Sequence, residues 1–289
     1  MDDLNLLQGV HYANERLLSE VDRICRKHRI TYYMWAGTLL GAVRHGDFIP
    51  WDDDVDLAFP RKDYDRFLSV AKEELGEEFE LVLPGEDDKF FDMIPKVNYK
   101  ASQIRTPGPD EKFYDNKHNR VALDVFALDE ACEGLLFKLQ LLRLKTVYGY
   151  ALGHRRCLNM KKYTGFTKFY VAVLSRIGKL MSMETINKKY RKASTWAGGS
   201  GSNYCIFNER IYFIYPKFNK NWFEEPSDYV IRGKNYWSVS DSDALLSRLY
   251  GNYMELPPVE KRVPIHSGAL QEIKVYLPDG TLYNEQHNR

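Results

Sequence analysis

Asp54 and Asp56 are the residues whose type and spacing most directly indicate chemistry in this sequence. They begin a strand-like run, and side chains on a strand alternate between its two faces. Both carboxylates therefore point the same way, while Val55 and Leu57 point into the protein. Two neighbouring carboxylates repel each other unless a cation lies between them. Hard oxygen ligands one strand period apart suit Mg²⁺ carrying a phosphate, so the pair predicts a metal site.

Asp52 and Asp53 extend this acidic run, and a solvated turn is the alternative explanation for such a stretch. A D-x-D spacing alone is weak evidence for a metal site. The preceding residues favour the chemical explanation, because Gly37 and Thr38 end the apolar run 30–35 and precede a short helical turn. At such a turn the backbone can approach phosphate oxygens, and the N–H groups of the helix N-terminus favour an anion.

This order of small-residue turn, short helix and D-x-D on the next strand resembles the signature of the nucleotidyltransferase superfamily. The stretch 36–57 also resembles the hallmark of the LicD family, bacterial phosphocholine transferases related to the fukutin-type proteins. Two later stretches are similar to that family, 121–129 and 250–262, the latter followed by His266. The resemblance spans nearly the whole chain, and its first motif is specific to the family but not to a substrate.

The resemblance implies a third metal ligand. The superfamily pattern expects a carboxylate on a later strand, and Asp124 interrupts the apolar strand pattern of residues 121–126. A buried carboxylate without a partner is costly, and a metal shared with Asp54 and Asp56 would supply that partner. The alternative is a hydrogen-bonded aspartate on an edge strand. Asp129, five residues on, is predicted to be a helix N-cap.

Further site residues are also implied by the family resemblance. Lys96 lies in a segment similar to the lysine-bearing strand of the family, although a lone lysine is more often a solvated surface charge. Arg44 and His45 follow the short helix, where a cation can neutralise charge developing on a leaving phosphate; an exposed loop is their alternative. The predicted substrate-binding set comprises Gly37, Thr38, Arg44, His45, Lys96, Arg262 and His266.

Periodicity predicts the elements that position these residues. We expect an α/β (α+β) fold: a nucleotidyltransferase-like mixed sheet flanked by helices, with an appended basic helical region. The predicted parts are a catalytic core at 1–132, the helical region at 133–195 and a C-terminal region at 196–289 that completes the active site. The predicted helices and strands are helices 7–25, 61–75, 133–152 and 243–250 and strands 79–83 and 91–98.

Charge is distributed unevenly along the 289 residues, although the net charge is only +1. Residues 1–137 hold 17 Lys/Arg against 28 Asp/Glu, residues 138–192 hold 14 against 1, and residues 193–289 hold 10 against 11. Basic amphipathic helices are typical of proteins that bind anionic membrane surfaces or polyanions. A basic lobe that pairs with the acidic half of the same fold is the alternative. No motif for nucleic-acid binding accompanies the charge.

Location is predicted from cysteine usage and from the N-terminus. The four cysteines have no C-x-x-C spacing, which argues against a zinc site or a disulfide framework. No signal peptide begins the sequence, and no run reaches the ~18 apolar residues of a membrane span. We therefore expect a cytoplasmic protein, with the inner face of the membrane as a further site of action.

Together these features predict an enzyme that transfers a phosphorylated alcohol. The family resemblance implies phosphocholine transfer from CDP-choline to a hydroxyl of a cell-surface glycan, such as a lipopolysaccharide or teichoic acid precursor. Asp54, Asp56 and Asp124 would hold one or two Mg²⁺ ions, or Mn²⁺ instead. Three alternatives remain: transfer of ribitol or glycerol phosphate from its CDP form, nucleotidyl transfer to a small acceptor, and non-catalytic binding through the basic block.

Overall fold

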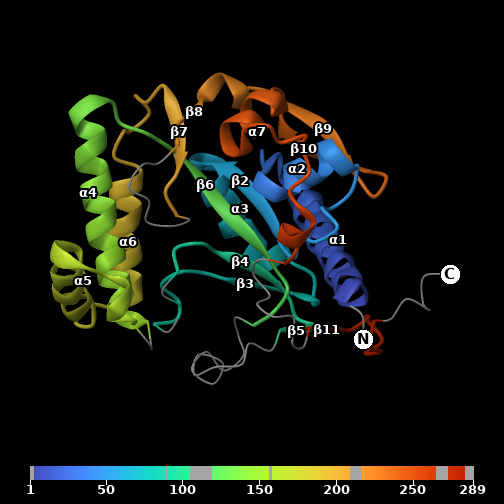
Figure 1. Cartoon of the computed structure of the whole chain (residues 1–289), viewed down its shortest axis with the longest axis horizontal. Coiled ribbons are helices and arrows are strands. Elements are labelled where there is room, and N and C mark those ends of the chain that lie inside the picture. Colours follow the sequence, from blue (N-terminus) through green and yellow to red (C-terminus); the bar gives the residue numbers. More distant parts are fainter. Residues whose placement is uncertain are drawn as a thin grey trace.

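The computed structural model describes residues 3–88, 90, 92–104, 119–155, 158–208, 216–264 and 273–283. A mixed seven-stranded sheet lies at its centre, with helices packed around it and three helices gathered at one side (Figure 1). This architecture confirms the predicted α+β class with a mixed sheet flanked by helices.

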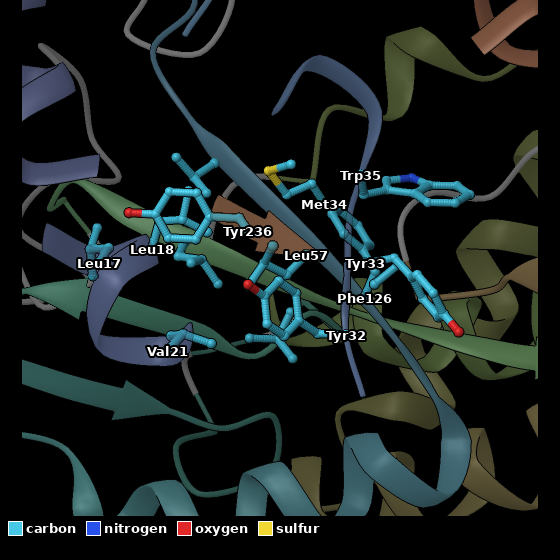
Figure 2. Close-up of a cluster of buried hydrophobic side chains, with 14 of the residues drawn as sticks. Leu17, Leu18, Val21, Tyr32, Tyr33, Met34, Trp35, Leu57, Phe126 and Tyr236 are labelled. Carbon is cyan, nitrogen blue, oxygen red and sulfur yellow. The ribbon is translucent and has the colours of Figure 1, made fainter. Parts of the chain in front are cut away.

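Helix α1 (Asp3–His28) packs its apolar face on the sheet. Leu17, Leu18 and Val21 recur at helical spacing and are fully buried. Figure 2 shows them beside Leu57 and a cluster of aromatic side chains from 32–35. The amphipathic helix predicted for this segment is therefore confirmed, and it supports the strands that carry the acidic residues.

The next elements follow the predicted order of strand, turn, helix and strand. They are β1 (Tyr33–Met34), α2 (Ala36–His45), β2 (Val55–Pro60) and α3 (Arg61–Glu74), followed by β3 (Phe79–Val82) and β4 (Lys96–Tyr99). Strand β4 begins later than predicted, at Lys96 instead of Phe91. Pro95 has no N–H to donate to a ladder, so regular pairing starts only after it.

Strand β6 (Ala122–Glu130) is the centre of the sheet, whose order is β1-β2-β6-β4-β3. Strand β2 runs parallel to β6 and places Asp56 opposite Asp124. Strand β4 runs antiparallel to β6 and places Lys96 opposite the same Asp124. The C-terminal half of β6 pairs with β7 (Asn203–Ile206), which in turn pairs with β8 (Phe218–Asn219).

The side chain of Asn208 links the two partners of β6. Strand β4 pairs with residues 122–124 and β7 with residues 128–130 of β6. Between these stretches, Asn208 Oδ1 accepts a hydrogen bond from the Ala127 amide at 3.2 Å, and Nδ2 donates to the Val125 carbonyl at 3.2 Å. Because Asn208 is fully buried, its amide group stands in for a missing strand residue.

Three helices form the basic region: α4 (Gly134–Ala151), α5 (Gly165–Gly178) and α6 (Met183–Ser194), with short 3-10 turns at Leu152–His154 and Met160–Lys162. Leu144 and Val147 of α4 and Ile186 of α6 belong to a second apolar cluster, separate from the main core. The helical region predicted here is present. Among the residues with described positions, no helix is both long and apolar enough to cross a membrane.

Asp129 is not a helix N-cap, so that prediction was wrong. Strand β6 continues to Glu130 and α4 begins only at Gly134, which leaves Asp129 inside the sheet with 1% of its surface exposed. Its two carboxylate oxygens accept hydrogen bonds from Arg61 of α3 at 2.7 and 2.5 Å. Burial disfavours the guanidinium, but the Asp129 carboxylate outweighs that effect and raises the pKa of Arg61.

The C-terminal part of the chain folds back onto the N-terminal part. Its elements are a 3-10 turn at Lys220–Phe223, the hairpin β9 (Pro226–Ile231) and β10 (Lys234–Val239), α7 (Ser242–Tyr250), a 3-10 turn at Val259–Lys261, and β11 (Ile273–Val275), which pairs with β5 (Ser102–Ile104). Ser238 Oγ of β10 donates to the Met34 carbonyl of β1 at 2.8 Å. Tyr236 of the same strand enters the cluster in Figure 2. The domain boundaries drawn from the sequence stay a prediction.

We predict that Asn208→Ala lowers the free energy of unfolding by about 2–4 kcal/mol. The substitution leaves the Ala127 N–H and the Val125 carbonyl buried without partners, and each such group costs roughly 1–3 kcal/mol. Denaturant unfolding followed by circular dichroism measures the change. Asn235→Ala, at an exposed position of β10, is the matched control and should stay within about 0.5 kcal/mol of the parent. Equal effects of the two substitutions would contradict this assignment.

Candidate active site

Three predicted site residues lie side by side across neighbouring strands. Asp56 of β2 and Lys96 of β4 flank Asp124 of β6, each in direct register with it. Residues in register project from the same face of a sheet. Asp54, two residues before Asp56, shares the side of the chain on which Asp56 lies and lines the same cleft. Val55 and Leu57 are fully buried, so the alternation predicted from the sequence is confirmed.

Lys96 neutralises part of this negative charge. Its Nζ lies 2.5 Å from Asp124 Oδ1, and both side chains are only partly exposed. Burial disfavours the ammonium group, but the carboxylates of Asp124, Asp92 and Asp56 outweigh burial and raise the pKa of Lys96. Lys96 therefore stays charged, which offsets repulsion among the carboxylates. Asp92 was not singled out from the sequence, because it lies outside every recognised motif.

Thr38 holds the backbone of Asp56 in place. Its side chain is almost fully buried, and Oγ1 accepts a hydrogen bond from the Asp56 amide at 2.9 Å. The amide of Trp35 donates to the Asp56 carbonyl at 2.9 Å, so both polar backbone groups of Asp56 are bound by the turn that begins α2. The small-residue turn thus positions an acidic residue of the site directly.

Gly37 permits a close approach of Asp52 to the start of α2. An ideal Cβ at Gly37 would lie 2.4 Å from Asp52 Oδ2, so a larger residue would displace the carboxylate. Helix α2 begins at Ala36, whose φ of 45° lies in the left-handed region, without a side-chain N-cap. The partial positive charge of a helix N-terminus favours an anion. In this structure Asp52 lies where the sequence analysis expected a phosphate.

His11 of α1 supports the acidic loop from below. Its Nε2 donates to the Asp52 carbonyl at 2.8 Å, and its ring stacks on Phe48 with centroids 5.4 Å apart. Burial lowers the pKa of His11, although the hydrogen bond to Asp52 acts the other way. The sequence analysis missed His11, yet its position one helical turn from Leu7, on the buried side of α1, was the available signal.

The acidic residues open into a cleft of about 390 Å³ between the N-terminal and C-terminal parts of the chain. The helix α2, the loop before β2 and the segment after α7 supply its walls, and Figure 1 shows α2 and α7 next to each other. The lining residues are Ala36, Gly37, Leu40, Arg44, Ile49, Trp51, Asp52, Asp54, Asp56, Tyr250, Asn252, Tyr253, Glu255, Pro257, Lys261 and Val263. The C-terminal segment therefore lies at the predicted site.

Arg44 joins α2 to the C-terminal segment. Its Nη1 donates to the Tyr253 carbonyl at 2.8 Å, and its Nε donates to His45 Nε2 at 3.0 Å. Burial, with Arg262 nearby, lowers the pKa of Arg44. Burial and the Arg44 charge lower the pKa of His45, so His45 is a neutral acceptor in this arrangement.

Trp51 links the acidic loop to the far wall of the cleft. The guanidinium of Arg262 lies over the Trp51 ring, 5.5 Å from its centroid, and the ring of His45 meets Trp51 edge-on at 6.0 Å. Arg262 also donates through Nε to the Pro257 carbonyl at 2.9 Å. Two cationic residues predicted from the sequence, Arg44 and Arg262, thus lie close to the cleft. The predicted His266 lies outside the described residues.

The acidic residues have the chemistry of a site for a hard divalent cation. Carboxylate oxygens from Asp52, Asp53 and Asp54 lie within 4.8 Å of one another, and Asp56 lines the same cleft. Several carboxylates converging in a partly buried place suit Mg²⁺ or Mn²⁺. Asp53 is 9% exposed, so the solvated-turn explanation does not describe it. The sequence analysis left Asp52 and Asp53 out of the metal site because they lie before the strand.

Comparison with known proteins identifies relatives of this chain. Residues 29–133 match the family described as LicD/FKTN/FKRP, nucleotidyltransferase domain. The lipopolysaccharide cholinephosphotransferase LicD of Haemophilus influenzae is 24% identical over 257 residues, which cover 86% of this chain and 92% of that protein. The ribitol 5-phosphate transferase FKRP of Homo sapiens is 56% identical over 34 residues, 12% of this chain and 7% of that protein. These matches confirm the family resemblance found in the sequence.

We predict that Thr38→Val reduces both stability and turnover, whereas Thr38→Ser largely preserves them. Valine has a similar shape but no hydroxyl, so the buried Asp56 amide loses its acceptor at a cost of roughly 1–3 kcal/mol. Serine keeps the acceptor and is the matched control. Denaturant unfolding and a turnover assay on each variant test the prediction, and a valine variant as active and stable as the serine variant would contradict it.

Proposed function

Because this chain carries a nucleotidyltransferase domain of the LicD/FKTN/FKRP family, we propose that it is a phosphotransferase that moves a phosphorylated alcohol from a CDP-linked donor to a glycan hydroxyl. The observation that carries the proposal is the row of Asp56, Asp124 and Lys96 beside a cleft. A cleft with converging carboxylates and nearby cations suits a donor with an anionic pyrophosphate and a bound divalent ion.

The proposed alcohol is phosphocholine, delivered from CDP-choline to a cell-surface glycan such as a lipopolysaccharide or teichoic acid precursor. The printed activity of the H. influenzae relative, which aligns along most of this chain, supports choline. The short but strong match to a ribitol 5-phosphate transferase supports ribitol phosphate as the alternative, with glycerol phosphate as a third CDP-alcohol. All three donors share the cytidine and pyrophosphate groups and differ only in the alcohol.

Asp54, Asp56 and Asp124 are the proposed ligands of one or two Mg²⁺ ions, and Asp52 and Asp53 lie close enough to join them. A bound Mg²⁺ would neutralise pyrophosphate charge and make CMP a better leaving group. Lys96 holds Asp124 by an ion pair at 2.5 Å, which keeps that carboxylate ionised. One of these carboxylates can also accept the proton of the attacking hydroxyl.

Residues across the cleft are proposed to hold the donor. Arg44 and Lys261 line it from opposite walls, and two cations facing each other attract an anionic pyrophosphate. Tyr250, Tyr253 and Trp51 offer aromatic faces in the same cleft, on which a cytosine ring can stack. The support for this part is the composition of the cleft wall, in which cations and aromatic rings alternate near the carboxylates.

Nucleotidyl transfer is the second candidate, because the matching family is described as a nucleotidyltransferase domain. The same carboxylates would serve, but the acceptor would attack the phosphorus next to cytidine. The third candidate, non-catalytic binding through the basic helices, predicts no dependence on Asp54. The cytoplasmic location remains a prediction from the sequence.

We predict Mg²⁺-dependent release of CMP from CDP-choline, in preference to CDP-ribitol and CDP-glycerol, when a lipopolysaccharide or teichoic acid preparation is the acceptor. Chromatography of the nucleotides measures the product. Asp54→Asn and Asp56→Asn should each lower the rate on the order of a hundredfold or more, because they weaken the metal site. Both variants should stay folded, since the substitution relieves repulsion. Asp228→Asn, at an exposed carboxylate paired with Arg26, is the matched control.

The outcomes separate the candidates. CMP release chiefly from CDP-ribitol or CDP-glycerol would replace phosphocholine by that alcohol phosphate and leave the site assignment intact. Unchanged rates in Asp54→Asn would contradict the acidic site, and absence of CMP with every donor, with or without Mg²⁺, would contradict the transferase itself.

A further inference from the structure

Helix α5 carries an apolar stripe on its outer side. Phe166, Phe169, Val173, Ile177 and Leu180 recur at intervals of three and four residues, which places them on one face of the helix. Phe166 is 79% exposed, Phe169 66% and Leu180 88%. The opposite face, which includes Val171 and Leu174, is buried against the neighbouring helices. Five large apolar side chains in a row on an exposed helix face indicate a surface that binds something.

Helix α4 extends this stripe into a continuous face. Leu135, Leu139 and Leu142 are exposed and share one side of α4. The helices are joined through Thr146, which accepts or donates a hydrogen bond with the Tyr170 hydroxyl at 2.7 Å. Figure 1 shows α4 and α5 together at the outer side of the molecule. We call the following residues the apolar face: Leu135, Leu139, Leu142, Phe166, Phe169, Val173, Ile177 and Leu180.

Basic side chains flank the apolar face. Residues 138–192 contain 14 Lys/Arg and a single acidic residue, Glu184. Lys161 and Lys162 are exposed just before Phe166, and Arg176 and Lys179 are exposed on α5 itself. Exposed cations beside exposed aromatic and aliphatic groups are typical of helices that lie in a membrane interface.

Other cations of the same block serve the fold. Arg191 of α6 pairs with Asp65 of α3 at 2.5 Å, and the guanidinium of Arg143 lies 3.7 Å from the centroid of the Trp196 ring. The idea of a basic lobe that pairs with the acidic half is therefore correct for α6. It does not account for Lys161, Lys162, Arg176 and Lys179, which are exposed beside the apolar face.

We propose that the apolar face and its basic flank dock this protein on an anionic membrane surface. Charge identifies the partner, because 14 cations against one acid complement anionic lipid headgroups. A second copy bound through the same face would bring two strongly cationic blocks together, which like-charge repulsion opposes. Nucleic acid would use the cations but leave the phenylalanines and leucines exposed. An anionic bilayer satisfies both, with apolar groups below the headgroups and cations among them.

Cosedimentation with vesicles tests the proposal. We expect the full chain to sediment with vesicles of phosphatidylglycerol and phosphatidylcholine, to bind phosphatidylcholine alone weakly, and to dissociate as NaCl rises from about 0.05 to about 0.5 M. Phe166→Ser with Phe169→Ser should weaken partitioning at least about tenfold, because two exposed rings no longer enter the bilayer. Val230→Ser, an exposed apolar residue on β9, is the matched control and should bind like the parent.

A second variant tests the charged flank separately. Lys161→Ser, Lys162→Ser and Arg176→Ser combined should weaken binding to anionic vesicles by about tenfold or more, since each cation near the surface contributes. Because all these side chains are exposed, circular dichroism should be unchanged. CMP release from a soluble donor should also be unchanged, which separates this proposal from the transfer reaction.

Three outcomes would overturn the proposal. The first is absence of binding to anionic vesicles at low salt, and the second is equal binding to neutral and anionic vesicles. The third is a serine double variant that binds like the parent. Self-association that Phe166→Ser with Phe169→Ser abolishes, without any vesicle binding, would assign the apolar face to a second copy instead.

Discussion

The parallel register between β2 and β6 places Asp56 directly beside Asp124, and the remaining features of the site depend on this juxtaposition. A slip of one residue would turn one of the two carboxylates to the opposite face of the sheet. In register they repel each other, and the third strand compensates by placing Lys96 opposite Asp124, with Nζ 2.5 Å from Oδ1. The remaining negative charge, together with Asp54, is what gives the cleft its affinity for a divalent cation.

Several interactions outside the cleft maintain this register. Asn208 replaces strand hydrogen bonds on the open edge of β6, and Thr38 fixes the Asp56 amide. The buried pair of Arg61 and Asp129 fastens α3 to the far end of β6. Removing one member of such a pair would leave the other charge buried and unpaired, which is strongly destabilising. His11 supports the backbone of the acidic loop from α1. The catalytic half is thus rigid where the C-terminal segment has to meet it.

The sequence predicted what local pattern can encode. The alternation at 54–57, the amphipathic α1, the helix after Pro60 and the neighbourhood of Asp124 followed from periodicity and from family motifs. Pairings between distant segments lay beyond it: no local signal connects Asn208 to β6 or Asp129 to Arg61, so Asp129 was mistaken for a cap. Likewise, the approach of Asp52 to Gly37 depends on the left-handed turn at Ala36, which propensity disfavours for a residue other than glycine.

The account's central claim is that the acidic row directs attack at the phosphorus distal to cytidine, so that CMP leaves and the alcohol phosphate is transferred. The most direct test uses two preparations of CDP-choline, one radiolabelled in choline and the other in cytidine, each incubated with enzyme, Mg²⁺ and acceptor glycan. The account predicts that choline label enters the glycan while cytidine label is recovered only as free CMP. Cytidine label on the acceptor would contradict it, because the reaction would then be nucleotidyl transfer at the same carboxylates.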